Sequence, residues 1–142
     1  MPTFLIPVDG SRYSDQAVDY AIARGGSCRD PVHVHLLNVQ APIAGVNVKL
    51  FVSRESLDRY YRDEAMAILD APRRKIEATG LTCEHHIGVG DPGQVAVEYA
   101  RDKACDEIVM GTHGRGAVAD VVMGSVAQKV IHLSPVPVVL VK

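Results

Sequence analysis

The residues with the clearest chemical potential are glycines and one serine in the last third of the chain. Gly111-Thr112-His113-Gly114 is followed, nine residues later, by Gly124-Ser125. The preceding residues 107–110 suit a buried strand, and the residues after Ser125 have helical periodicity. Glycines at a strand-to-helix connection let the backbone approach a ligand, and a helix N-terminus offers unpaired N–H groups to an anion. The pattern predicts a phosphate-binding loop, although a flexible loop with a helix cap would also fit it.

Charged side chains in and near this loop could also meet a phosphate. Arg115 lies between the glycines, where its guanidinium could grip phosphate oxygens through two bonds or remain in solvent. His113 could donate to a phosphate or be exposed, and Lys129 fits the outer surface of the following helix better than a phosphate site. Asp120 would either repel a phosphate or help to hold Mg²⁺. Both interpretations of Asp120 stay open.

Three segments together resemble a known family. The glycines and Ser125 match the signature G-x2-G-x9-G-(S/T), Pro7-Val8-Asp9-Gly10-Ser11 stands near the start, and an apolar strand, 136–141, ends the chain. In these respects the sequence is similar to the ATP-binding subfamily of the universal stress protein family, over nearly its whole length. The resemblance implies that ATP, or AMP or ADP, is bound, with Mg²⁺ as a companion of ATP.

The resemblance also implies roles for individual residues. Main-chain groups around Pro7 and Val8 would line the adenine and ribose pocket, Asp9 would be a polar anchor, and Val39 and Met110 would lie beside the base. The apolar residues would face the core in any α/β sheet, and Asp9 could instead cap the first helix. The candidate nucleotide-binding residues are Pro7, Val8, Asp9, Ser11, Val39, Met110, Gly111, Gly114, Arg115, Gly116, Gly124, Ser125 and Val126.

Composition limits the other partners. The 142 residues carry 15 basic and 17 acidic side chains, a net charge of −2, with no basic stripe, and aromatic residues make up 5%. Both values disfavour nucleic acid as a partner.

The length fits one domain over residues 1–142. Three scattered cysteines without a CxxC pair favour reduced thiols in the cytoplasm, and no apolar run predicts a secretion signal or a membrane span.

Apolar runs alternate with helical patterns along the chain. Strands are expected at residues 3–9, 33–39, 82–89, 107–111 and 136–141. This alternation is typical of right-handed βαβ units, and therefore of a three-layer α/β/α fold with an open parallel five-stranded sheet, Rossmann-like or flavodoxin-like. The resemblance implies the strand order 3-2-1-4-5 of adenine nucleotide alpha hydrolase-like proteins. In that order Asp9 and the Gly111 loop flank one crevice.

Caps and glycines predict the helix bounds. Ser14 should cap a first helix with Val18, Ala21 and Ile22 on its buried face, and Gly25-Gly26 should end it. A second helix should run from Ser53 to about Thr79, with Leu57, Tyr61, Ala65 and Ile68 on one face and a kink or break at Pro72. A third should follow Asp91-Pro92 and bury Val95, Tyr99 and Ala100, and the last should bury Val126, Ala127, Val130 and Ile131. Residues 40–51 fit no period and should be a mobile, functional loop.

Several enzyme classes lack their required residues. Gly124 is followed by Ser125-Val126 rather than by Lys-Ser or Lys-Thr, and no G-x-G-x-x-G follows the first strand, which excludes a Walker A loop and a dinucleotide fingerprint. A Ser-Gly-Gly-x-Asp-Ser turn and the acidic cluster of a receiver domain are also missing. The histidines predict no convincing metal set: His33 and His35 share a strand face, whereas His85 and His86 point to opposite faces.

The favoured hypothesis is a nucleotide-dependent regulatory module of a stress response, in which bound ATP alters the loop at 40–51, the glycine loop or a dimer. One alternative is a slow Mg²⁺-dependent ATPase with Asp9 near the metal, and another is a nucleotide-free interaction protein of the same fold. The apolar segment Val136–Val141 contains Pro137 and should form a sheet edge. A homodimer would cover this edge, as the resemblance implies, unless the chain's own surface shields it.

Overall fold

The computed structural model describes residues 1–43, 53–116 and 122–142. Most of the loop expected at 40–51, and Asp120, therefore lie outside the described residues. Among the helices that are described, none combines the length and apolar character needed to cross a membrane. The cysteines Cys28, Cys83 and Cys105 are free.

A parallel sheet of five strands forms the centre of the fold. Its strands are β1 (Thr3–Pro7), β2 (His33–Gln40), β3 (Thr82–Val89), β4 (Glu107–Gly111) and β5 (Val138–Val141). Their order is β3-β2-β1-β4-β5, and every neighbouring pair is parallel. The predicted sheet and strand order are confirmed. Because β1 lies next to β4, two segments about one hundred residues apart in sequence end side by side.

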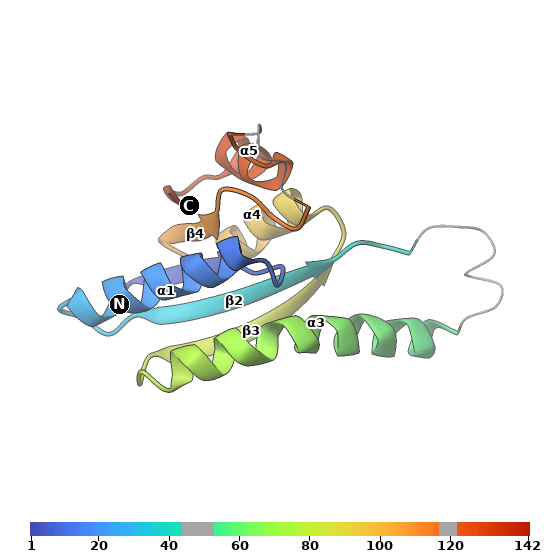
Figure 1. Ribbon diagram of the computed structural model, residues 1–142, viewed down its shortest axis with the longest axis horizontal. Coiled ribbons are helices and arrows are strands. Elements are labelled where there is room, and N and C mark those ends of the chain that lie inside the picture. Colours follow the sequence, from blue (N-terminus) through green and yellow to red (C-terminus); the bar gives the residue numbers. More distant parts are fainter. Residues whose placement is uncertain (44–52, 117–121) are drawn as a thin grey trace.

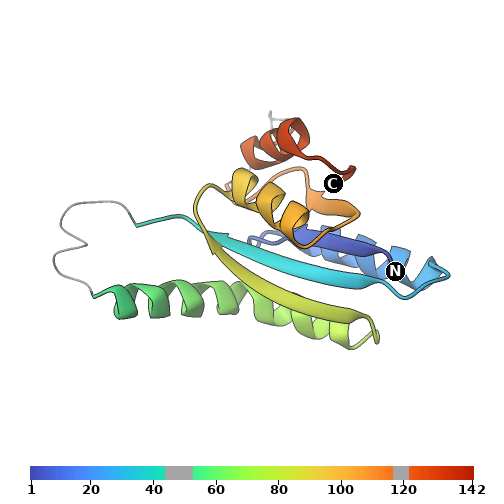
Figure 2. The same ribbon diagram turned by 180° about the vertical axis from the view of Figure 1, so that it is seen from behind.

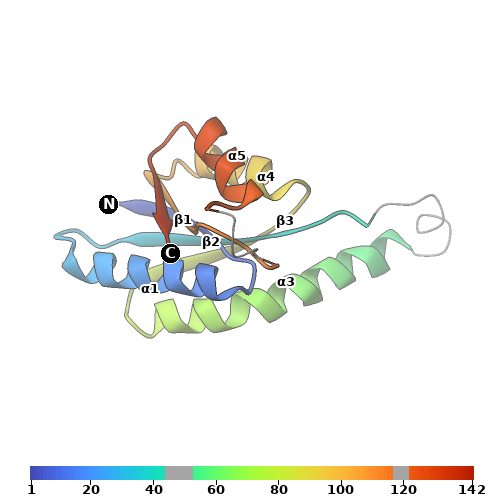
Figure 3. The same ribbon diagram turned by 45° about the horizontal axis from the view of Figure 1, so that its top comes forward.

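Helices cover both faces of the sheet. They are α1 (Arg12–Ser27), α3 (Arg54–Glu77), α4 (Pro92–Asp102) and α5 (Ser125–Leu133). Helices α1 and α3 lie on one face, and α4 and α5 lie on the other (Figures 1 and 3). Seen from behind, α4 and α5 stand above the strands while α3 runs along the opposite side (Figure 2). The three predicted layers are therefore present.

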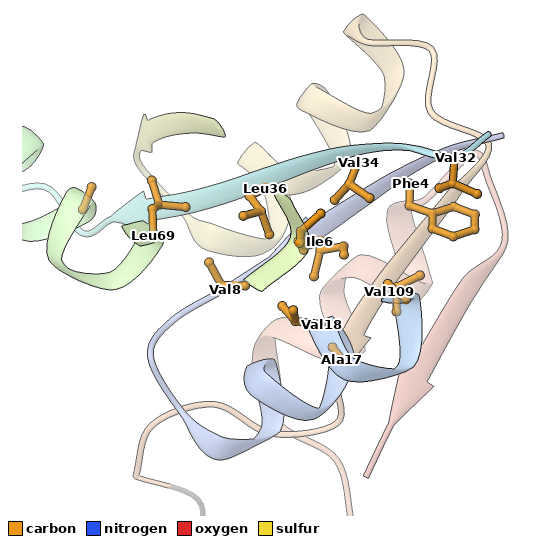
Figure 4. Close-up of a cluster of buried hydrophobic side chains, with 13 residues drawn as sticks. Phe4, Ile6, Val8, Ala17, Val18, Val32, Val34, Leu36, Leu69 and Val109 are labelled. Atoms are coloured by element: carbon orange, nitrogen blue, oxygen red, sulfur yellow. The ribbon is translucent and has the colours of Figure 1, made fainter. Parts of the chain in front are cut away.

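Each face of the sheet has its own apolar core. On the α1 and α3 side, the fully buried Phe4, Ile6 and Val34 pack with Leu69 of α3 and Val109 (Figure 4). On the other side, Leu5, Leu37 and Ile108 of the same strands pack with Ala96 of α4 and Val130 of α5. The strands are thus apolar on both faces, as a buried parallel sheet requires.

The bounds of α1 differ from the prediction. Ser11 is the N-cap residue, because its side chain accepts a hydrogen bond from the Ser14 main-chain N–H at 3.3 Å, and Ser14 itself is buried inside the first turn. Gly25 and Gly26 do not end the helix, which continues to Ser27. A Cβ at Gly25 would lie 2.9 Å from Leu81, so this glycine serves close packing rather than helix termination.

Helix α3 is capped by Ser53 as predicted, but it is not broken at Pro72. Its buried face follows helical spacing and comprises Tyr61, Ala65, Leu69, Pro72 and Ile76. Burial of this face against the sheet outweighs the loss of one helical hydrogen bond at proline. The predicted face was partly wrong, since Leu57 and Ile68 are only half-buried.

Smaller differences concern strand ends and two helix faces. Strand β1 ends at Pro7 rather than at residue 9, and β5 begins only after Pro137. In α4 the fully buried positions are Gly93, Ala96 and Ala100, and the predicted Val95 and Tyr99 are half-buried. In α5, Ala127 and Val130 are buried as predicted, whereas Ile131 is 44% exposed.

Two isoleucines test this assignment of the core. Ile76 of α3 is fully buried, and Ile131 of α5 is largely exposed. We expect Ile76→Ala to lower the free energy of unfolding by about 2–5 kcal/mol, because it removes buried methyl groups and leaves a cavity. Ile131→Ala, the matched control, should cost at most about 1 kcal/mol. Urea denaturation measures both, and equal losses would show that another surface covers Ile131.

Candidate functional site

A cavity of about 330 Å³ opens where β1 and β4 end. The chain continues from β1 into α1 on one face and from β4 toward α5 on the other, so the two connections diverge around it. Divergence of this kind is where open α/β sheets bind ligands. The lining residues are Pro7, Val8, Asp9, Ser14, Leu37, Val39, Pro92, Met110, Gly111, His113, Gly114, Arg115, Gly116, Gly124, Ser125, Val126 and Ala127.

The cavity brings together every candidate nucleotide-binding residue named from the sequence except Ser11. Ser11 is instead occupied as the N-cap of α1. Sequence reasoning did not select Ser14, Leu37, Pro92 and Ala127. Two signals could have found some of them: Leu37 precedes Val39 by two residues and so shares its strand face, and Ala127 lies in the first turn of α5.

Asp9 joins the end of β1 to the glycine loop. Its Oδ1 accepts a hydrogen bond from the Ser11 main-chain N–H at 2.9 Å, and its Oδ2 accepts one from the Arg115 main-chain N–H at 3.3 Å. The Asp9 main-chain N–H donates to the Ser14 hydroxyl at 3.4 Å. The carboxylate therefore holds two loops that are 106 residues apart in sequence. It does so without being the cap of α1.

The glycines of the loop are required for different reasons. A Cβ at Gly111 would lie 2.9 Å from main-chain atoms of Tyr13, so this glycine admits α1 rather than a ligand. A Cβ at Gly114 would lie 2.6 Å from the Asp9 Oδ2, so this one admits the carboxylate. Gly116 has φ +72°, which favours glycine directly. The expectation that all of them serve ligand approach is therefore too simple.

The N-terminus of α5 faces the cavity without a side-chain cap. Gly124 is its N-cap residue, with no side-chain hydrogen bond, and the first turn contains no acidic residue. The Gly124 main-chain N–H donates to the Thr112 carbonyl at 2.7 Å, which fixes the start of the helix against β4. Ser125, Val126 and Ala127, the first three residues of the helix, all line the cavity. Such a terminus attracts an anion.

The opposite wall of the cavity is apolar. Val8 and Met110 are 4% and 5% exposed, and Val39 is half-buried beside them. The Val8 N–H donates to the Leu37 carbonyl at 2.8 Å, and the Val8 carbonyl accepts a bond from the Asn38 amide at 2.8 Å. Both main-chain groups of Val8 already have partners within the sheet. This wall therefore offers mainly apolar contact to a flat ring.

Two cations near the site are placed differently. Arg115 is exposed, and its guanidinium lies over Gly10, where a Cβ would come within 2.5 Å of Nη2. Lys129 pairs with the Asp91 carboxylate at 3.0 Å. The Gln94 main-chain N–H, followed by Lys129, lowers the pKa of Asp91. Lys129 is thus engaged at the start of α4, whereas Arg115 stands at the cavity.

The described lining residues offer several groups that can bind a ligand. The cavity combines N–H donors at a helix N-terminus, one guanidinium and an apolar wall. Among the described residues that line it, Asp9 is the one carboxylate, and it already accepts two main-chain hydrogen bonds. His113 contributes a polar edge, with its Nδ1 2.9 Å from the Thr112 hydroxyl. A ligand with an anionic end and an apolar, planar end matches this arrangement.

Known proteins resemble this chain in sequence and in fold. Universal stress protein MJ0531 of Methanocaldococcus jannaschii is 30% identical over 138 residues, which cover 97% of this chain and 80% of that protein. The solved structure of MJ0577, from the same organism, has a TM-score of 0.87 at 28% identity and covers 99% of this chain and 95% of that one. A universal stress protein solved in complex with cAMP has a TM-score of 0.72 at 27% identity. The alignment covers 99% of this chain and 97% of that one.

The family model of the universal stress protein family matches residues 1–142, the whole of the sequence. The match includes both segments that border the cavity, the end of β1 with Asp9 and the glycine loop before α5. Fold, strand order and sequence therefore lead to one assignment, and the chain belongs to the universal stress protein family.

Proposed function

We propose that this chain binds an adenine nucleotide, ATP first of all, in the cavity at the ends of β1 and β4, and acts as a nucleotide-dependent regulatory module in a stress response. The observation that carries the proposal is the uncapped N-terminus of α5, which opens into a cavity with an apolar far wall. A related protein, 27% identical, has been solved in complex with cAMP, and this supports an adenine nucleotide as the ligand.

The two ends of the cavity set the orientation of the nucleotide. The phosphates lie at the N–H groups of Ser125 and Val126, with Arg115 as a further partner at the open side. The adenine lies between Val39 and Met110, where apolar contact is available. A longer phosphate tail gains more from the helix terminus and from Arg115. ATP should therefore bind more tightly than AMP, and Mg²⁺ would accompany the triphosphate.

Ser125→Asp tests the phosphate end without weakening the fold. Ser125 is exposed at the first position of α5, where a carboxylate stabilises a helix but repels a phosphate. We expect the affinity for ATP to fall at least about tenfold, roughly 1.4 kcal/mol, while Tm stays level or rises. Calorimetric titration with ATP, AMP and cAMP measures the affinities.

Ser53→Asp is the matched control, because Ser53 is an exposed N-cap of α3 that does not line the cavity. This variant should bind ATP as the unmodified chain does. If Ser125→Asp also binds ATP unchanged, the phosphate site is not at α5. If the unmodified chain binds no adenine nucleotide at millimolar concentration, the proposal fails and the nucleotide-free interaction protein replaces it.

Asp9 separates binding from hydrolysis. Removing its carboxylate in Asp9→Ala frees the main-chain N–H groups of Ser11 and Arg115, so the glycine loop loses its anchor. We expect ATP affinity to fall about fivefold, close to 1 kcal/mol, with multiple-turnover phosphate release at background both before and after the change. Asp15→Ala, an exposed carboxylate in the first turn of α1, is the control. Phosphate release that Asp9→Ala abolishes, in a variant that still folds, would support the slow ATPase instead.

A homodimer through β5 is part of the proposal. Strand β5 ends the sheet order with β4 on one side, and all four of its residues are half-buried. Leu133, the last residue of α5, is 45% exposed. Pairing with a second copy would cover the β5 edge. Light scattering over a concentration series should give twice the mass of the chain, and a constant single-chain mass would overturn this arrangement.

A further inference from the structure

A cluster of histidines lies on the sheet outside the cavity, nearer the start of β2. His33 and His35 alternate along β2, and Glu84 and His86 alternate along β3, so each pair presents both side chains to one face. The register sets His35 directly opposite Glu84 and Leu37 opposite His86. Four metal-ligating side chains therefore come from two adjacent strands. The site described above uses none of them.

The distances within this cluster are short. The His33 Nε2 lies 2.6 Å from the Glu84 Oε2, and the His35 Nδ1 lies 3.8 Å from the same oxygen. The His35 Nδ1 is also 2.8 Å from the His86 Nε2. One ligand atom from each of His33, His35 and Glu84 falls within 4.8 Å of the other two. The ligand atoms converge on one point rather than spreading over the strand.

From this convergence we propose that His33, His35 and Glu84 bind Zn²⁺, with His86 as a fourth ligand. Imidazole nitrogens and a carboxylate oxygen are ligands of Zn²⁺, which they hold at about 2.0–2.2 Å. Two ligand atoms bound tetrahedrally are roughly 3.3 Å apart. The His35–His86 contact at 2.8 Å and the His33–Glu84 contact at 2.6 Å therefore both need to open, by about 0.5 Å and about 0.7 Å. Small rotations of these side chains would provide that movement.

The surroundings suit a cation that enters from solvent. The side chain of His35 is 8% exposed and forms the floor, whereas those of His33 and Glu84 are 21% and 55% exposed and form the entrance. Burial, followed by neighbouring charges, lowers the pKa of both His35 and His86, which disfavours their charged forms.

Other possible ligands are less suited. His85 lies between Glu84 and His86 on the strand and so faces the opposite side of the sheet. Cys83 is also on that side, within the core of α1 and α3, and burial raises the pKa of its thiol to about 11. Lys103 opposes a cation here, because its charge lowers the pKa of His35 and His86. The ligands are therefore expected to be nitrogen and oxygen alone.

The test is calorimetric titration of the full chain with ZnCl₂ after removal of bound metal by a chelator. We expect one Zn²⁺ per chain with a micromolar or lower dissociation constant, and no competition from Mg²⁺, which prefers oxygen ligands. Zinc at a hundred times the dissociation constant should raise Tm by about 5–10 °C. Visible absorption after substitution by Co²⁺ should show tetrahedral bands without a thiolate charge-transfer band.

Variants of His33 and Glu84 can locate the site, because neither side chain belongs to the apolar core and the fold should tolerate the changes. His33→Ala and Glu84→Gln should each weaken Zn²⁺ binding at least roughly tenfold. His85→Gln, on the same strand, should bind as the unmodified chain does. ATP affinity should be unchanged in all three variants, which separates this site from the nucleotide cavity. Absence of stoichiometric Zn²⁺ binding, unaltered binding in His33→Ala and Glu84→Gln, or a thiolate band would overturn the proposal.

Discussion

The region around the cavity depends on the hydrogen bonds that the Asp9 carboxylate accepts from the main chain of Ser11 and Arg115. They link the turn that starts α1 to the glycine loop after β4, and the sheet alone does not fix the distance between those segments. Gly114 is part of the same constraint, since any side chain there would displace the carboxylate. A buried or half-buried carboxylate needs such partners, so the loop satisfies Asp9 while Asp9 positions the loop.

One helix of this fold lacks a stabilising side-chain cap at the cavity. Ser11, Ser53 and Asp91 cap α1, α3 and α4 through side-chain hydrogen bonds, whereas α5 begins at Gly124 without one. A side-chain cap is worth about 1 kcal/mol. Among the described helices, the one without it is the helix whose first turn lines the cavity. The free N–H groups are thus concentrated where an anion can reach them.

The sequence predicts the strands and the glycine loop because both have local sequence patterns. Alternating apolar runs predict the five strands, and the position of glycines after β4 predicts the loop. The strand order came from the family resemblance, since periodicity says nothing about which strands are neighbours. The errors come from tertiary contacts, which sequence periodicity does not reveal. Gly25 packs against Leu81 inside α1, and α3 continues through Pro72 because its buried face packs on the sheet. Gly111 is needed because Tyr13, rather than a ligand, lies against it. The histidine cluster was missed because it depends on the register between β2 and β3.

Strand β2 carries both sites on one face. His33 and His35 belong to the cluster near its start, and Leu37 and Val39 line the cavity near its end. Coupling between ligands needs an element with two arrangements. Strand β2 is instead a rigid support, because it pairs with β3 along its length and with β1 over His33–Leu37. A metal ion bound at the cluster would link the edge strand β3 to β2 and leave Leu37 and Val39 of the cavity wall in place. Under the proposed function, a bound nucleotide would therefore act through the segments that Asp9 and Gly124 hold, the glycine loop and α5, more readily than through the sheet.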